Sequence, residues 1–426
     1  MRQPPPLDGK RVFLTGVFDM QNYGDLLFPL IAQRRLAEIG AEIIPVAPTG
    51  VFPGLQDAMA PSDISEMLNG ESSVGAILVG GGYLIHTHRM DVLREYKDAN
   101  VGEWAGPALW LGAALAAALR DVPLAWNAPG VPHPIPPSQR RLVDAALRAS
   151  SYLSVRDRGG AELLDAPADI PVSIVPDPIA ELARLWTRRD LEAPFRNLLA
   201  RKNASIESDF VAVHFRNRSL AGLPPPEAAA MLRDFSLRTG LTPIIVAVGR
   251  THDDDVLARA ISAYLDAPHI LIDDPVSLRE IASAIAFSRL YIGASLHGYV
   301  TALAYGAPAI LVAKPAYRKF AGFLEHMDRM QDMALDWRSA YAAAAARKEE
   351  SRAERIPATV FAALDEHWRR VKESIETRES GAAGRRAFLS EMLAFGLREL
   401  GPEWAMRPIT RRAPRFVPMK QSEVAP

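Results

Sequence analysis

The sequence predicts an α/β protein with two Rossmann-like domains and a helical C-terminal extension. Short apolar runs rich in β-branched residues alternate with helical patterns as far as residue 312, which is typical of parallel sheets covered by helices. A charged stretch without strand character divides these runs into two sets, and only helical patterns follow residue 330. We therefore expect a first domain at 1–182, a connector at 183–208, a second domain at 209–330, a helical extension at 331–406 and a flexible tail at 407–426.

The first set of apolar runs predicts six strands. They are expected at 11–15, 43–46, 74–79, 124–127, 152–155 and 172–175, with helices at 25–39, 107–120 and 138–148 between them. Gly40 follows the first of these helices and is a plausible C-cap.

The second set predicts strands at 210–215, 243–248, 270–272, 290–292 and 309–312. The clearest helix lies at 277–288, where Leu278, Ile281 and Ile285 recur at helical spacing and would face the sheet. Two similar halves joined by a connector favour a GT-B-like arrangement. Ligands would then meet the carboxyl ends of the strands in a cleft between the domains.

Composition narrows the classes of function. The chain has 426 residues, and 49 Lys and Arg against 50 Asp and Glu leave a net charge of -1, which argues against a global electrostatic grip on nucleic acid. The absence of cysteine excludes disulfides, thiolate catalysis and Cys-based zinc sites. The longest apolar stretch, 107–119, is shorter than the roughly 20 residues that span a bilayer, and no signal core is visible. We expect a cytoplasmic protein, with peripheral membrane contact left open.

The most informative segment for chemistry is Gly293–Gly298, which follows a strand and opens a helix. His297 would lie at the N-terminus of that helix, where free amides and a partial positive charge favour an anion. A histidine there serves as an acid, a base or a phosphate ligand, or else simply caps and packs the helix. Both interpretations stay open at this point.

Cationic residues follow several of the predicted strands. His214 and Arg216 end strand 210–215, and an arginine facing a cleft makes a good carboxylate or phosphate clamp, with a surface salt bridge as the alternative. For Arg156 with Asp157 we favour a structural ion pair or a helix cap. Arg318 and Lys319 would either meet an anionic ligand or form a solvated basic face.

Two polar or flexible loops also follow strands of the first domain. Gly80, Gly81 and Gly82 would let backbone approach backbone, or let a ligand approach amides. For Asn22 and Asp25 we favour capping of the next helix over ligand binding. The spacing fits neither a dinucleotide fingerprint nor a P-loop.

No metal site or cofactor is predicted. His86 and His88 lie two residues apart without a carboxylate to complete a ligand set. The three aspartates at 253–255 are expected at a helix N-terminus instead.

Taken together, these segments resemble the polysaccharide pyruvyl transferase family. Their order and approximate spacing hold from residue 11 to about residue 325. The matching segments are Asn22 to Asp25, Gly80 to Gly82, Arg156 with Asp157, Asp177 with Pro178, Ser295 to Gly298, Gly306 to Pro308, and Lys319 with Phe320.

The resemblance implies an enzyme that moves the pyruvyl group of phosphoenolpyruvate, as a co-substrate, onto a sugar of an exopolysaccharide or cell-surface glycan precursor, lipid-linked or free. It implies that His297 acts as an acid or base or stabilises the leaving phosphate, and that Arg216 binds the carboxylate or phosphate of the substrate. The implied substrate contacts are Asn22, Asp25, Gly80, Gly81, Gly82, Arg156, His214, Ser295, Gly298, Arg318 and Lys319.

One position departs from the family pattern. Many members carry Arg where this chain has Ser295, and a serine supplies no charge to grip phosphoenolpyruvate. Arg216, Arg318 or Lys319 would have to replace that charge. Two other functions stay open: a GT-B glycosyltransferase that uses a nucleotide sugar, and a non-catalytic sugar-binding relative.

Overall fold

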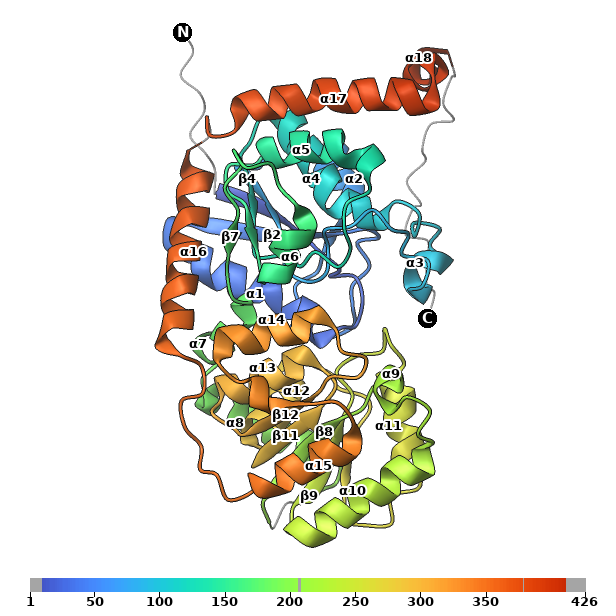
Figure 1. The fold of residues 1–426 in the computed structure, drawn as a ribbon, viewed down its shortest axis with the longest axis vertical. Coiled ribbons are helices and arrows are strands. Elements are labelled where there is room, and N and C mark those ends of the chain that lie inside the picture. Colours follow the sequence, from blue (N-terminus) through green and yellow to red (C-terminus); the bar gives the residue numbers. More distant parts are fainter. Residues whose placement is uncertain (1–9, 206–207, 378, 411–426) are drawn as a thin grey trace, which may run out of the picture.

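Two α/β domains are stacked along the long axis of the molecule (Figure 1). The computed structural model describes residues 10–205, 208–377 and 379–410. The chain crosses to the second domain near residue 185 and returns to the first domain in its last helices. This is the GT-B-like arrangement that the sequence predicts.

The first domain is built on a five-stranded parallel sheet in the order β3-β2-β1-β4-β5. Its strands are β1 (Lys10–Thr15), β2 (Ala41–Ala47), β3 (Ser62–Asp63), β4 (Ala76–Val79) and β5 (Leu124–Trp126). Its larger helices are α1 (Tyr23–Leu36), α4 (Ala105–Arg120) and α5 (Arg140–Arg148). The last two predicted strands, β6 (Ser154–Val155) and β7 (Ser173–Ile174), pair with each other in a separate small sheet.

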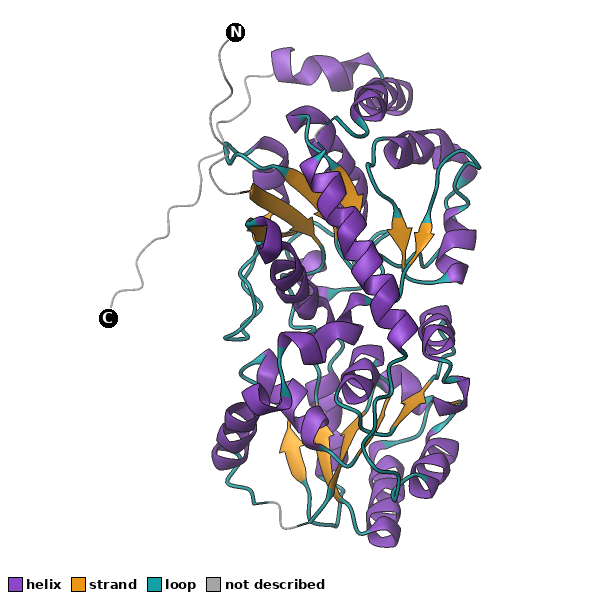
Figure 2. Ribbon diagram, turned by 90° about the vertical axis from the view of Figure 1, so that its left-hand side faces the viewer, coloured by secondary structure: helices purple, strands orange, loops and turns teal. Residues whose placement is uncertain are grey.

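The second domain contains a six-stranded parallel sheet in the order β10-β9-β8-β11-β12-β13. Figure 2 shows strands of this sheet in the lower half of the molecule, with helices on both sides. Its strands are β8 (Phe210–His214), β9 (Thr242–Val246), β10 (Ile270–Ile272), β11 (Leu290–Gly293), β12 (Ala309–Val312) and β13 (Met333–Ala334). Its helices are α10 (Pro225–Thr239), α11 (Asp254–Ser262), α12 (Leu278–Phe287), α13 (Leu296–Ala304), α14 (Arg318–Met327) and α15 (Trp337–Ala346). Residues 333–346 were expected in the helical extension, but β13 and α15 complete this domain.

Short helical segments complete the architecture. They are η1 (Ala37–Ile39), α2 (Ile64–Asn69), α3 (Arg94–Asp98), η2 (Pro137–Gln139), α6 (Arg158–Leu164), η3 (Pro178–Glu181), α9 (Asn217–Leu220) and η4 (Met330–Asp332). Gly40 ends η1 in the left-handed conformation at φ 66°, so its predicted capping role is confirmed. Ser277 begins α12 by accepting a hydrogen bond from the N–H of Glu280 at 3.1 Å.

The expected connector is part of the second domain. It forms α7 (Leu182–Leu185) and α8 (Arg188–Arg201), and α8 packs along α12. Phe195 stacks between Phe210 and Phe287, with ring centroids 5.5 and 5.1 Å apart. The charged outer face of α8 conceals this apolar contact in the sequence pattern, so the prediction of a linker is corrected.

The last helices pack back on the first domain. They are α16 (Ala358–Glu376), α17 (Ala382–Leu400) and α18 (Pro402–Thr410). Trp368 of α16 is buried and donates its indole N–H to Glu181 at 3.1 Å. Residues 407–410 were expected in the flexible tail but are helical, and 411–426 lie outside the described residues. Among the helices described, none combines the length and the apolar character needed to cross a membrane.

The packing of α16 gives a first prediction. Trp368→Ala should lower the free energy of unfolding by about 3–5 kcal/mol, because it opens a cavity and leaves Glu181 without its indole partner. Urea denaturation measures the change. Leu237→Ala is the control, because Leu237 is 74% exposed on α10, and it should change the stability by less than about 0.5 kcal/mol. Equal effects of both substitutions would contradict this packing.

Candidate functional site

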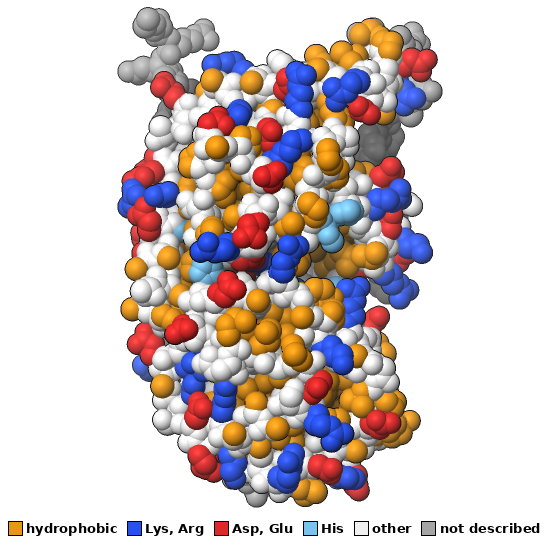
Figure 3. Space-filling view, viewed as in Figure 1, with side chains coloured by type: hydrophobic (Ala, Val, Ile, Leu, Met, Phe, Trp, Pro, Cys, Tyr) orange, Lys and Arg blue, Asp and Glu red, His pale blue; other side chains and the backbone are white. Residues whose placement is uncertain are grey.

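A pocket of about 500 Å³ lies between the two domains, beyond the carboxyl ends of their central strands. Figure 3 shows Lys and Arg side chains spread over this face of the molecule, including the level where the two domains meet. Residues 17–25, 82–93 and Arg156 supply the wall from the first domain, and residues 216–218, 251–253, 295–297, Tyr317 and Lys319 supply the opposite wall. Four of the lining residues are Lys or Arg and two are Asp, so the pocket suits an anion.

His297 lies in the first turn of α13 and faces this pocket. Ser295 caps the helix by accepting the N–H of Gly298 at 3.2 Å. The imidazole is 15% exposed, and its Nε2 lies 3.5 Å from Oδ2 of Asp177. Burial alone would raise the pKa of Asp177, but His297 and Arg156 outweigh it and hold that pKa below its usual value.

Gly24 makes room for the histidine ring. A β-carbon at this position would lie 1.5 Å from Nδ1 of His297. Every other amino acid would therefore displace the ring. The glycine of the Asn22–Asp25 loop has a steric role that sequence reasoning did not assign.

Arg156 is the deepest cation of the pocket. Its side chain is 5% exposed, and its guanidinium lies 4.4 Å from the ring centroid of Tyr83. Nη1 is 3.8 Å from Asp177, while Nε and Nη2 have no hydrogen-bond partner within the described part of the chain. A buried charge with unpartnered donors is costly, and an anion bound in the pocket would reduce that cost.

Asp157, the neighbour of Arg156, has a separate structural role. Its carboxylate accepts the N–H of Gly160 at 2.6 Å and so begins α6. The predicted helix cap is confirmed. The Nε of Arg156 lies 3.7 Å from the same carboxylate, so the two neighbours also form the expected ion pair.

Lys319 approaches the same aromatic ring from the second domain. Its Nζ lies 5.2 Å from the ring centroid of Tyr83, and its backbone N–H donates to the Tyr83 hydroxyl at 3.2 Å. Burial, reinforced by Arg156 and Arg216, lowers the pKa of the Lys319 amine to about 7. The amine therefore changes charge near neutrality and is sensitive to an anion beside it.

Arg216 enters from the end of β8. Its side chain is 21% exposed, its Nη2 lies 3.3 Å from Asp254, and its Nε has no partner among the described residues. His214 is fully buried and contacts the same carboxylate at 3.0 Å. His214 therefore does not line the pocket. It holds Asp254, which in turn orients Arg216.

Asn22 and Asp25 form a pair on the wall of the first domain. Asn22 stands at the N-cap position of α1 but donates its amide to Oδ2 of Asp25 at 2.6 Å, and it makes no side-chain cap. The favoured capping role is therefore corrected. Burial raises the pKa of Asp25 despite the opposing charges of His297, Lys319 and Arg156. Gly82 adopts φ 93° beside this carboxylate.

Four other expected contacts lie outside the pocket lining. Gly80 and Gly81 let β4 approach Thr15 and Phe28, since β-carbons there would lie 2.3 and 2.1 Å from those residues. Gly298 similarly clears the hydroxyl of Tyr291. Arg318 is exposed and donates to the carbonyl of Pro132 at 3.2 Å.

Several lining residues were missed by sequence reasoning. They are Tyr83, which follows the triple glycine, Asn217 and Arg218, which begin α9 after β8, and Thr251 and His252, which lie in the loop after β9. The rule that ligands meet the carboxyl ends of strands points to the segments that follow β8 and β9. The sequence alone did not show which of their side chains turn inward.

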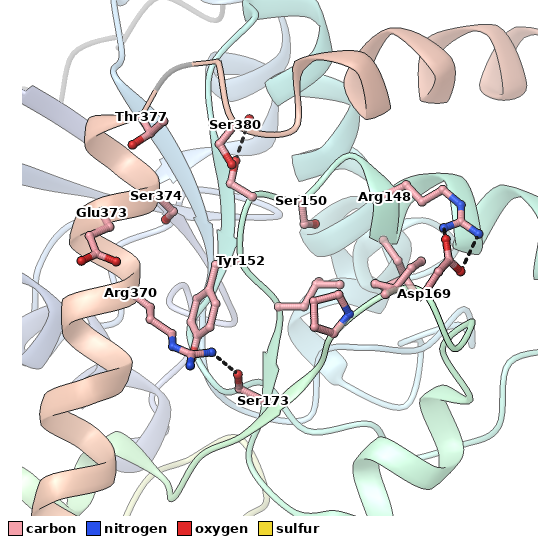
Figure 4. Close-up of a pocket in the computed structure, with 15 residues that line it drawn as sticks. Arg148, Ser150, Tyr152, Asp169, Ser173, Arg370, Glu373, Ser374, Thr377 and Ser380 are labelled. Carbon is pink, nitrogen blue, oxygen red and sulfur yellow. Dashed lines mark hydrogen bonds and ion pairs between the residues drawn. The ribbon is translucent and has the colours of Figure 1, made fainter.

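A second pocket, of about 540 Å³, lies among α5, β7 and α16 (Figure 4). Its charged groups are paired: Arg148 contacts Asp169 at 3.1 Å, and Arg370 contacts Glu366 and Ser173 at 2.8 and 3.2 Å. Because these arginines are already satisfied, the interdomain pocket is the better anion site. Within the described ranges, no group of three or more His, Cys, Asp or Glu residues is placed to hold a metal ion.

The profile of the polysaccharide pyruvyl transferase family matches residues 22–313, which is more than half of the chain. The chain belongs to the polysaccharide pyruvyl transferase family. The match includes Asn22, Arg156, Arg216 and His297 and ends shortly before Lys319.

Solved structures with the same fold are distant in sequence. The UDP-N-acetylglucosamine 2-epimerase of Rickettsia bellii is 12% identical with a TM-score of 0.53, covering 87% of this chain and 98% of its own. The UDP-GlcNAc 2-epimerase of Methanocaldococcus jannaschii is 12% identical with a TM-score of 0.51, covering 91% and 99%. Staphylococcus aureus MnaA with UDP is 10% identical with a TM-score of 0.50, covering 92% and 97%. These likenesses show the fold alone, and no curated protein matches the chain significantly.

The environment of Lys319 gives a second prediction. Its Nζ should titrate with a midpoint near pH 7, followed by NMR of ¹³C-labelled lysine side chains and assigned by loss of the signal in Lys319→Arg. Sulfate does not titrate in this range, and its binding should raise the midpoint, because a nearby anion favours the ammonium form. A midpoint above about pH 9 without sulfate would show that the amine is not desolvated.

Proposed function

We propose that this protein transfers the pyruvyl group of phosphoenolpyruvate to a saccharide as a ketal, on a precursor of an exopolysaccharide or cell-surface glycan. Family membership supports the reaction class. The observation that carries the proposal is the buried guanidinium of Arg156, which lines a cationic pocket and whose Nε and Nη2 have no hydrogen-bond partner among the described residues.

Phosphoenolpyruvate carries a phosphate and a carboxylate on one small enol, so it requires cations on two sides. Arg156 and Lys319 form one cationic group around Tyr83, and Arg216 with Arg218 forms another on the wall of the second domain. Bidentate arginine suits either anionic group of the substrate. In this proposal Lys319 and Arg216 together replace the family arginine that is absent at Ser295.

The reaction needs a proton at the methylene carbon of phosphoenolpyruvate and a base for the sugar hydroxyls. One hydroxyl oxygen bonds to the central carbon as the methylene becomes a methyl group. Phosphate then leaves with the electrons of its C–O bond, and a second hydroxyl oxygen closes the ketal. His297 donates the proton to the methylene carbon and accepts protons from the sugar hydroxyls, while Asp177 orients the ring.

The direct test measures the released product. Phosphate should appear from phosphoenolpyruvate only when a saccharide acceptor is present, and no nucleotide should be released from nucleotide sugars under the same conditions. Nucleotide release would favour a glycosyltransferase instead. Saccharide binding without any product from phosphoenolpyruvate, across a broad acceptor panel, would indicate a non-catalytic relative.

Arg156 gives a third prediction. Arg156→Ala should lower kcat/KM for phosphoenolpyruvate by about 10²–10³, because the pocket loses its deepest positive charge. Arg158→Ala is the matched control: this arginine is two residues away and exposed, and its loss should change the rate by less than about threefold. Similar rates for the two variants would remove Arg156 from the site.

His297 gives a fourth prediction. His297→Ala should lower kcat by about 10² or more, as expected for the loss of a group that transfers protons in the transition state. Asp177→Asn should give a smaller loss and shift the pH profile, because the ring would lose its carboxylate partner. A folded His297→Ala protein with unchanged kcat would require another acid or base.

A further inference from the structure

Tyr83 lies where cations of the two domains meet. The guanidinium of Arg156 lies 4.4 Å from the centroid of its ring, and Nζ of Lys319 lies 5.2 Å from the same centroid. Arg156 is one of the charges that lower the pKa of Lys319, so the two positive groups repel each other. The negative charge density of an aromatic face offsets part of this repulsion. The ring therefore helps an arginine and a lysine to share one end of the pocket.

Close backbone contacts fix the position of this ring. Tyr83 pairs with Gly130 in a parallel bridge, and the N–H of Gly130 donates to the carbonyl of Gly82 at 2.7 Å. A β-carbon at Gly130 would lie 2.5 Å from Cδ1 of Tyr83 and 2.7 Å from Nη2 of Arg156. Any larger residue at this position would displace the ring or the guanidinium. The contact between Tyr83 and Arg156 is thus built into the backbone.

The hydroxyl of Tyr83 has a proton to donate. It accepts the backbone N–H of Lys319 at 3.2 Å. A phenol carries one donor besides its acceptor sites. The described residues provide no acceptor for this donor, and Tyr83 lines the interdomain pocket. An anion bound in the pocket would supply the acceptor.

We propose that Tyr83 binds the substrate directly: its hydroxyl donates a hydrogen bond to an anionic oxygen of phosphoenolpyruvate, and its ring holds Arg156 and Lys319 beside that oxygen. The inference rests on the proposed function and adds a neutral donor to a cationic site. A hydrogen bond to a charged oxygen is stronger than one between neutral groups, so the loss of this hydroxyl is measurable. A contact that is equal in the ground state and the transition state changes KM rather than kcat.

The test uses Tyr83→Phe, which removes the hydroxyl and keeps the ring. Sulfate is the probe, because its binding needs no turnover and can be followed at the Lys319 signal in NMR of ¹³C-labelled lysine side chains. The Kd of sulfate should rise about tenfold or more. The KM for phosphoenolpyruvate should rise comparably, with kcat changed by less than about threefold. Tyr83→Leu should weaken sulfate binding further, because both cations also lose the aromatic face.

A second measurement separates a direct contact from a displaced lysine. Without sulfate, the Lys319 midpoint of Tyr83→Phe should stay near pH 7, because burial is the main cause of the lowered pKa and the ring is retained. A midpoint above about pH 9 in this variant alone would assign the effect to movement of Lys319 and would overturn the direct contact.

Tyr264→Phe is the matched control. Tyr264 is 60% exposed and lies outside the pocket lining, so the Kd of sulfate and the KM should stay within about twofold of the wild type. Circular dichroism confirms that each variant is folded. An unchanged affinity of Tyr83→Phe for sulfate would overturn the inference. Sulfate binding that depends on Tyr83, in a protein that releases no phosphate from phosphoenolpyruvate, would instead contradict the proposed function, since the anion contact would remain without that substrate.

Discussion

The site depends on one buried positive charge. The guanidinium of Arg156 is held against Tyr83 and near Asp177, at the end of a strand in the first domain. An isolated charge in such a place is unfavourable. The fold therefore surrounds it with an aromatic face and a carboxylate, but two of its nitrogens have no hydrogen-bond partner among the described residues. Arg216, Arg218 and Lys319 of the second domain line the same pocket. The pocket is therefore complete only when both domains meet.

The backbone around this charge explains why small residues gather there. Gly24 gives the His297 ring its position, and Gly82 turns the chain away beside Asp25. Gly80 and Gly81 lie outside the pocket lining and allow the chain to pack closely against Thr15 and Phe28. The loops that contain Gly24 and Gly82 resemble a simple helix start and a tight turn. Their small residues leave room for charged side chains from distant parts of the chain to meet in one cavity.

Much of the fold could be predicted from the sequence, because buried parallel strands appear as short apolar runs in a single sequence. The apolar face of α12, formed by Leu278, Ile281 and Ile285, and the C-cap at Gly40 are local features of this kind. The prediction of a connector missed the packing of α8, because the apolar side of this helix makes a long-range contact. Phe195 stacks on Phe210 and Phe287, which lie far away in the sequence. The strand β13 is two residues long and has no pattern of its own.

The site was predictable to the level of strand ends. His297, Arg156, Arg216 and Lys319 all follow strands or open helices, and all four line the same pocket. The direction of a side chain was not predictable: His214 turns into the core towards Asp254, while Arg216, two residues later, faces the cavity. The roles of Tyr83 and Gly24 depend on contacts between the domains, which no local pattern records.

The central claim is that a doubly charged enol binds between Arg156 and the cations of the second domain. A crystal structure of the protein soaked with phosphoenolpyruvate tests it most directly. The account predicts that density fills the interdomain pocket, with a phosphate or carboxylate oxygen within hydrogen-bonding distance of the Arg156 guanidinium and with His297 beside the enol. Density for the ligand elsewhere, or in this pocket but out of reach of Arg156, would contradict it.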